Sequence, residues 1–177
     1  MAGKQTTFDF RDGEGPVPAH QHSNGGGWVA DTAVVSKTVY VDMDARVYDN
    51  ASVRGWVSLH DSVRVHGMAC LDGAMNIYDE VGVSGEVKMI GGDELSLEGD
   101  LKISATPVII TELLPWPIVF VREPRRMVAI GCNTLSPEEW RKRAAQLARD
   151  AHAPHGSVRK LMQLLDLVYG KPPKHKR

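Results

Sequence analysis

Two histidines, His60 and His66, are the residues of this 177-residue chain whose type and spacing first indicate chemistry. An imidazole can ligate a metal ion, and it can also act as a general base. Zinc needs three or four ligands that converge within about 2 Å of the ion. The segment "HQH" adds His20 and His22, which could both ligate a metal if this segment is extended. Two histidines alone make a weak metal site, so a solvated segment is the competing interpretation.

A second set of candidate residues is basic and lies in the C-terminal part of the chain. Residues 1–104 hold eight Lys or Arg against sixteen Asp or Glu, whereas residues 105–177 hold thirteen against six. This asymmetry predicts two regions with different surfaces, and a basic surface attracts an acidic partner. The alternative is that the two halves complement each other inside one oligomer. The candidate partner-binding residues are Arg122, Arg125, Arg126, Arg141, Lys142, Arg143 and Arg149.

Nucleic acid is the other partner that such charge could attract, because phosphates favour basic side chains. The basic segments carry no interleaved aromatic residues for base stacking, and no recognised nucleic-acid motif occurs. A solvated helix surface would also explain the charge. The sequence therefore favours an acidic protein as partner and leaves nucleic acid open.

Composition excludes several classes of protein. No run of about 18 apolar residues occurs, so we expect no contact with a membrane. The N-terminus shows no apolar segment after its first basic residue, which argues against a secretory signal. Two cysteines, Cys70 and Cys132, then indicate free thiols in a cytoplasmic protein. The spacings CxxC, HExxH, GxxxxGK and GxSxG are absent, and we expect no cofactor and no catalytic set.

The elements that position these side chains follow from a six-residue period. An aliphatic residue returns at every sixth position from Val29 to Met89, and a second apolar residue occupies the fifth position of each unit. The third position favours Asp or Gly, which suit a turn with unusual backbone angles. One such unit cannot bury its own apolar face, so the units must stack as a β-solenoid. The rhythm slips by two residues at "IGGDE" and resumes at Leu95. A sandwich of alternating strands has no reason to keep this phase.

Residues 28–104 resemble the hexapeptide-repeat family of left-handed parallel β-helices. The resemblance implies three hexapeptides in each triangular coil, residues eighteen apart lying above one another, and a homotrimer. The segments "NGGGWVADTA" and "VAIGCNTLSPEEW" also resemble repeat proteins often encoded by bacteriophages and prophages. This second likeness implies a phage setting in the cytoplasm of a host cell and no particular reaction. It also implies that the acidic partner is a host protein.

The hexapeptide family includes zinc-dependent carbonic anhydrases and histidine-dependent acyltransferases, so His60 and His66 define an alternative enzyme site at a subunit interface. Both occupy the second position of their hexapeptides, which should point outward on different faces. Asp42 could orient the imidazole of His60. The repeat lacks the long loop that encloses an acyl donor in the acyltransferases. It places four residues one coil away from the two histidines: Asp42 and Tyr78 around His60, and Tyr48 and Ser84 around His66.

The segments on either side of the repeat complete the expected fold, which is mainly β with a small α+β C-terminal region. Residues 1–27 lack periodicity and predict an irregular arm that caps the solenoid, with Trp28 filling its end. Residues 105–132 predict two or three antiparallel strands, within the ranges 108–111, 118–122 and 126–131.

Residues 133–170 predict two helices. Ser136 followed by Pro137 and Glu139 is typical of a helix start with a capping box, and this helix should run to about Asp150. The second helix should begin near Ser157 and end before residue 170. Residues 171–177 are basic and rich in proline, and we expect them to be disordered.

The hypothesis that combines these observations is a non-enzymatic binding or scaffold protein that acts by protein–protein interaction. The phage likeness adds host takeover, inhibition of a host defence system or virion assembly as its setting. One alternative is the enzyme with His60 or His66 at a subunit junction. Another is the sequestration of a small anionic ligand between subunits, in a cleft lined by Arg54 or Arg64.

Overall fold

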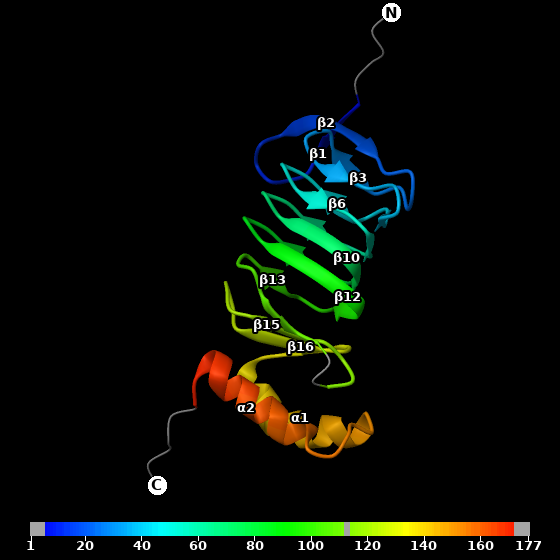
Figure 1. Ribbon diagram of the computed structural model, residues 1–177. Coiled ribbons are helices and arrows are strands. Elements are labelled where there is room, and N and C mark those ends of the chain that lie inside the picture. Colours follow the sequence, from blue (N-terminus) through cyan, green and yellow to red (C-terminus); the bar gives the residue numbers. More distant parts are fainter. Residues whose placement is uncertain (1–5, 112–113, 172–177) are drawn as a thin grey trace, which may run out of the picture.

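The computed structural model describes residues 6–111 and 114–171 of the chain. Figure 1 shows three consecutive parts: a β-solenoid of about four turns, a small antiparallel sheet across its end, and two helices beyond that sheet. Successive turns of the solenoid pair through parallel strands, so the chain advances from one end of the molecule to the other. The predicted mainly β fold with two C-terminal helices is confirmed.

Short parallel strands build the solenoid, and each pairs with the strand one turn away. One sheet contains β3, β6, β9, β11 and β13 in this order, and a second contains β4, β7, β10, β8 and β5 in this order, with β12 also paired to β10. The strands are β3 (Trp28–Ala30), β4 (Val34–Val35), β5 (Tyr40–Val41), β6 (Arg46–Val47), β7 (Ser52–Val53), β8 (Trp56–Leu59), β9 (Arg64–Val65), β10 (Cys70–Ile77), β11 (Gly82–Val83), β12 (Lys88–Leu97) and β13 (Lys102–Ile103).

The pairing register joins residues eighteen positions apart, as the resemblance implied. Val29 pairs with Val47, which in turn pairs with Val65. The two-residue slip appears between β10 and β12, where Gly73 pairs with Gly91 but Met75 pairs with Leu95. The insertion is therefore absorbed as an irregularity in one strand, and the stacking continues beyond it.

The six-residue phase forms the interior of the solenoid. Every aliphatic residue of the first position from Val41 to Met89 is at most 1 % exposed, and Val29 is equally buried. The fifth positions from Val39 to Val87 are at most 2 % exposed. Only Val35 and Ala33, in the first turn, are partly exposed. Each large aliphatic side chain buried in this way contributes about 2 kcal/mol, so the repeated column is the main source of stability.

The Asp residues of the third position hold the corners of the solenoid. Asp49, Asp61 and Asp79 have positive φ angles of 57°, 49° and 60°. Their carboxylates accept hydrogen bonds from the next turn: Asp49 Oδ2 from the amide of Gly67 at 2.9 Å, and Asp79 Oδ2 from that of Gly99, also at 2.9 Å. Aspartate tolerates this backbone conformation and ties neighbouring turns together, which explains the pattern in the sequence.

The N-terminal arm is more regular than its lack of periodicity indicated. Strands β1 (Thr7–Asp9) and β2 (Pro16–Gln21) form an antiparallel hairpin that continues the sheet beyond β3. Trp28 stacks on Phe8, with ring centroids 4.4 Å apart, and belongs to the arm's own apolar cluster. The prediction that it fills the solenoid end is therefore wrong. The glycine-rich turn covers β5 instead: a Cβ on Gly25 would lie 2.1 Å from the carbonyl oxygen of Val41.

A four-stranded antiparallel sheet separates the solenoid from the helices. Its strands, in spatial order, are β14 (Val108–Ile110), β15 (Ile118–Val121), β16 (Met127–Ile130) and β17 (Asn133–Leu135). The three predicted strands are present, and β17 was not predicted. Val119 and Val121 pack with the solenoid interior, whereas Ile118 and Phe120 pack with the helices. Both faces of this sheet are thus covered (Figure 1).

The two helices are α1 (Pro137–Asp150) and α2 (Ser157–Tyr169), close to the predicted bounds. The capping box is present: the amide of Glu139 donates to Ser136 Oγ at 3.2 Å, and the amide of Ser136 donates to Glu139 Oε2 at 3.0 Å. No helix among the described residues is long and apolar enough to span a membrane. The predicted basic tail lies outside the described residues, except for Lys171.

Candidate functional site

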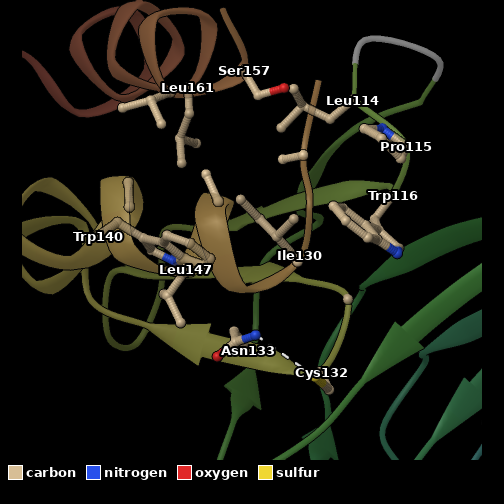
Figure 2. A pocket seen from close by; sticks show the side chains of 16 residues that line it. Leu114, Pro115, Trp116, Ile130, Cys132, Asn133, Trp140, Leu147, Ser157 and Leu161 are labelled. Atoms are coloured by element: carbon tan, nitrogen blue, oxygen red, sulfur yellow. Dashed lines mark hydrogen bonds between the residues drawn. The ribbon is translucent and has the colours of Figure 1, made fainter. Parts of the chain in front are cut away.

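An apolar cavity of about 170 Å³ lies in the C-terminal region, between the two helices and the end of the small sheet. Figure 2 shows that α1, α2, the 114–116 segment and the turn after β16 surround it. Trp116, Ile130 and Leu161 are among the side chains that line it. The described lining residues contain no Asp, Glu, Lys or Arg, so this cavity can accept an apolar group and offers no acid–base pair.

Small side chains of the helix α1 leave room for the cavity. Trp140, Ala144, Leu147 and Ala148 of α1 line the cavity, and the two alanines are too short to fill the space beside α2. The indole of Trp140 is fixed because its Nε1 donates to the carbonyl oxygen of Val128 at 2.8 Å. The cavity is therefore part of the folded structure, because one of its walls is a fixed aromatic side chain.

Cys132, Asn133 and Ser157 are the polar residues in the described lining of the apolar cavity. Cys132 is exposed and carries a free thiol, and the amide nitrogen of Asn133 donates to its Sγ at 3.6 Å. Ser157 is buried, and its hydroxyl donates to the carbonyl oxygen of Pro154 at 2.7 Å. These groups mark the cavity wall without forming a nucleophile and base pair.

A second, more open hollow adjoins the apolar cavity, and we call it the basic hollow. Arg149, His152 and His155 line it, together with the first residues of α2. The cavity and the hollow share four lining residues: Ala148, Ala153, Ser157 and Val158. The described lining of the basic hollow contains no acidic residue.

The predicted partner-binding residues lie in several separate parts of the C-terminal region. Arg122, Arg125 and Arg126 are exposed on the turn between β15 and β16. Hydrogen bonds from Ser136 are the main cause that lowers the pKa of Glu139. The charges of Arg125 and Arg143 lower it further. We call Arg122, Arg125, Arg126 and Arg143 the basic turn group, since the first and third act on Tyr169 at the end of α2 and the other two act on Glu139 at the start of α1.

The hydroxyl of Tyr169 holds the basic turn in place. It lies 2.7 Å from the carbonyl oxygen of Val121 and 2.8 Å from that of Met127, so its single proton donates to either of them. The guanidinium carbon of Arg126 lies 5.9 Å from the centroid of the Tyr169 ring. Burial raises the pKa of Tyr169 to about 12, although Arg122 and Arg126 act in the opposite direction.

Three of the predicted basic residues lie apart from the basic turn group. Arg141 is engaged within the fold, because its Nη2 lies 3.0 Å from Asp166 Oδ1 and donates to the carbonyl oxygen of Gly170 at 3.0 Å. Lys142 is exposed on α1. Arg149 lines the basic hollow, six residues further along the helix than Arg143.

The two histidines of the repeat stack on tyrosines of neighbouring turns. His60 packs on Tyr78 with ring centroids 4.5 Å apart, and His66 packs on Tyr48 at 4.7 Å. They lie at the ends of β8 and β9, which belong to different sheets, so this chain does not bring them together. The Asp42 carboxylate accepts from the amide of Met43, and the imidazole of His66 lies beside the carboxylate of Asp49.

The candidate metal ligands His20 and His22 contact different neighbours in the N-terminal arm. His20 Nδ1 lies 2.8 Å from Asp31 Oδ1, whereas His22 is buried with its Nδ1 beside Asn24. Within residues 6–111 and 114–171, no group of three His, Cys, Asp or Glu residues could hold a metal ion.

The arginines proposed for a small anion lie on different parts of the solenoid. Arg64 pairs in register with Arg46, and burial followed by the charge of Arg64 lowers the pKa of Arg46. Arg54 lies at the corner between β7 and β8, which belong to a different sheet from β6 and β9, the strands that carry Arg46 and Arg64.

Comparison with known proteins gives no further identification. No protein family model, no curated protein sequence and no solved structure matches the chain. The apolar cavity is the feature that the sequence reasoning missed, although the repeated alanines of α1 were its visible signal.

Proposed function

We propose that this protein is a non-enzymatic binding protein that uses its basic turn group to contact an acidic partner protein. The observation that carries the proposal is the gathering of Arg122, Arg125, Arg126 and Arg143 at one end of a solidly packed region. The solenoid supports this end, since the small sheet packs against both its interior and the helices. Exposed arginines on a fixed turn lose little conformational freedom when they bind carboxylates, which favours recognition.

The finer features of the proposal come from sequence resemblance. We propose a left-handed coil of three hexapeptides per turn, a homotrimer, and a phage-encoded protein that acts in the host cytoplasm on a host or defence protein. The enzyme with His60 or His66 at a subunit junction is the alternative of a different class. Alanine at both positions with no change in any phage or host phenotype would remove that alternative.

An affinity experiment with charge-reversed baits tests the proposed function. Wild type, an Arg125→Glu/Arg126→Glu double variant and a Lys37→Glu/Lys88→Glu control are exposed to nuclease-treated host extract. The control reverses two exposed lysines on the solenoid, so its net charge changes by the same amount. We expect the same protein to be retained by wild type and control and lost by the arginine variant.

The other outcomes of this experiment are equally informative. Equal retention by all three baits contradicts the role of the basic turn group. Loss of all bound material on nuclease treatment identifies nucleic acid as the ligand instead.

A further inference from the structure

The apolar cavity has the size of a single bulky side chain. Its volume of about 170 Å³ is similar to that of engineered apolar cavities of about 150 Å³ that bind benzene. Trp140, Ile130 and Leu161 provide an apolar wall, and the indole of Trp140 is already held by its hydrogen bond to the chain. A leucine or phenylalanine side chain would fill this space and lose its contact with water.

The basic hollow beside the cavity provides donors for a negative group. Arg149, His152 and His155 line it, and the side chain of Arg149 is oriented along α1 by its contact with Gln146. The first turn of α2 borders the same hollow, and its N-cap, Gly156, has no side chain that could accept a hydrogen bond from it. The side chains of Arg149, His152 and His155 and the positive end of the α2 dipole therefore favour a carboxylate at this place.

The charge of the hollow selects among the occupants that the cavity could take. The chain's own segment 171–177 carries four basic residues and no acidic one, so it has the wrong charge. A partner segment that joins a bulky apolar residue to an adjacent carboxylate satisfies the cavity and the hollow together, because they share the wall formed by Ala148, Ala153, Ser157 and Val158.

We infer that the apolar cavity is the anchor pocket for one leucine- or phenylalanine-sized side chain of an acidic partner protein, and that the basic hollow receives the neighbouring carboxylate. This inference rests on the proposed function and names a second contact of the same partner. It assigns Arg149 a role separate from that of the basic turn group, and it gives the specificity that exposed arginines alone lack.

Short blocked peptides test the pocket directly. The probes are N-acetyl-Phe-Asp-amide, its Phe-Asn and Phe-Lys analogues, and N-acetyl-Ala-Asp-amide. Binding is read from the indole N–H resonances of Trp140 and Trp116, and from the rate at which iodoacetamide alkylates Cys132 in a Cys70→Ser background. We expect Phe-Asp to shift both resonances and slow the alkylation, Phe-Asn to bind about tenfold more weakly, and Ala-Asp not to bind.

Three variants connect the probe to the two contacts. Ala148→Leu fills the space shared by the cavity and the hollow and should abolish binding, and its thermal unfolding shows that it is folded. Arg149→Gln should reduce Phe-Asp binding to the level of Phe-Asn. Lys142→Gln is the matched control, because it removes a positive charge from the same helix but outside both linings and outside the basic turn group, and it should leave binding unchanged.

Several results would overturn the inference. No response of Trp140 or Cys132 to Phe-Asp means that the cavity takes no side chain, and equal binding of Phe-Lys removes the role of the hollow. Dissociation of an oligomer by Ala148→Leu, measured by sedimentation, means that a second copy of this chain fills the cavity. Capture of the partner by Ala148→Leu as strongly as by wild type overturns this inference alone, whereas capture by no bait overturns the proposed function.

Discussion

The imidazole ring of His66 lies parallel to the phenol ring of Tyr48, with centroids 4.7 Å apart and 1° between the ring planes. The stack continues from Tyr48 to Phe10 at 4.9 Å. Asp49 Oδ2 lies 3.6 Å from His66 Nδ1 and favours the charged imidazole, but burial is the larger effect and lowers the pKa of His66. The ring therefore acts as a neutral packing surface that joins one turn of the solenoid to the next and to the N-terminal arm.

The lowered pKa of His66 predicts a pH-dependent stability. The unfolded chain binds the imidazole proton with an ordinary pKa of about 6.5, more tightly than the folded chain, so protonation favours unfolding. The free energy of unfolding should decrease as the pH falls through about 6.5 and level off below the folded-state pKa. Urea unfolding of wild type and His66→Gln between acidic and neutral pH checks this. An equally steep pH dependence in the variant would contradict it.

The corner aspartates predict a graded series of variants at Asp79. This residue has a φ of 60°, and its carboxylate accepts a hydrogen bond from the amide of Gly99 at 2.9 Å. Asp79→Ala loses that hydrogen bond and strains the backbone, at a cost of about 2 kcal/mol. Asp79→Asn keeps an accepting oxygen and tolerates the same φ, so its stability should stay close to wild type. Chemical denaturation of both variants separates these outcomes. Equal losses of stability in the two variants would contradict the role of this hydrogen bond.

The close stacking of glycines in the solenoid predicts a large loss of stability when a side chain is added at Gly73. A Cβ on Gly73 would lie 2.2 Å from the carbonyl oxygen of Gly91, and this backbone atom cannot move without disturbing the turn. Gly73→Ala should therefore lose at least about 3 kcal/mol of stability. Gly99→Ala is the matched control, because its φ of 90° is similar to the 95° of Gly73 but no atom lies within 4 Å of the added carbon. The control should lose about 1 kcal/mol.

Much of the fold could be predicted from the sequence because the solenoid repeats one local pattern of apolar and turn residues. The residues from Val41 to Met89 had to be buried once the period was six, and the start of α1 at Ser136 was visible from its capping residues. The N-terminal hairpin could not be found in this way. Its strands have no period of their own, and Phe8 and Phe10 are ordered by contacts with Trp28 and Tyr48 that only the folded chain creates.

The candidate site was less predictable for a different reason. The arginine-rich turn at 122–126 is evident in the sequence, but the engagement of Arg141 with Asp166 is a contact between two helices that local patterns do not specify. The apolar cavity depends on where α2 packs relative to the alanines of α1, and the same small residues could equally have allowed close helix packing.

The contact of Tyr169 with the small sheet predicts that α2 controls the position of the basic turn. Its hydroxyl lies within 2.8 Å of both the Val121 and Met127 carbonyl oxygens, at the two ends of that turn. Tyr169→Phe should lose about 1–2 kcal/mol of stability and speed hydrogen exchange in residues 122–126. The control Tyr78→Phe keeps its ring beside His60 in the solenoid and should leave the turn unaffected.

The pKa of Tyr169 gives the same contact an independent test at alkaline pH. Burial raises this pKa to about 12, so an unfolded tyrosine, with a pKa near 10, ionises first. The free energy of unfolding should therefore decrease as the pH rises from about 10 to about 12, and this decrease should be smaller in Tyr169→Phe. The ultraviolet absorbance of phenolate should show one tyrosine fewer among the late-titrating groups of the variant. If the variant shows as many late-titrating tyrosines as wild type, Tyr169 does not have the raised pKa, and its buried contact with the turn is contradicted.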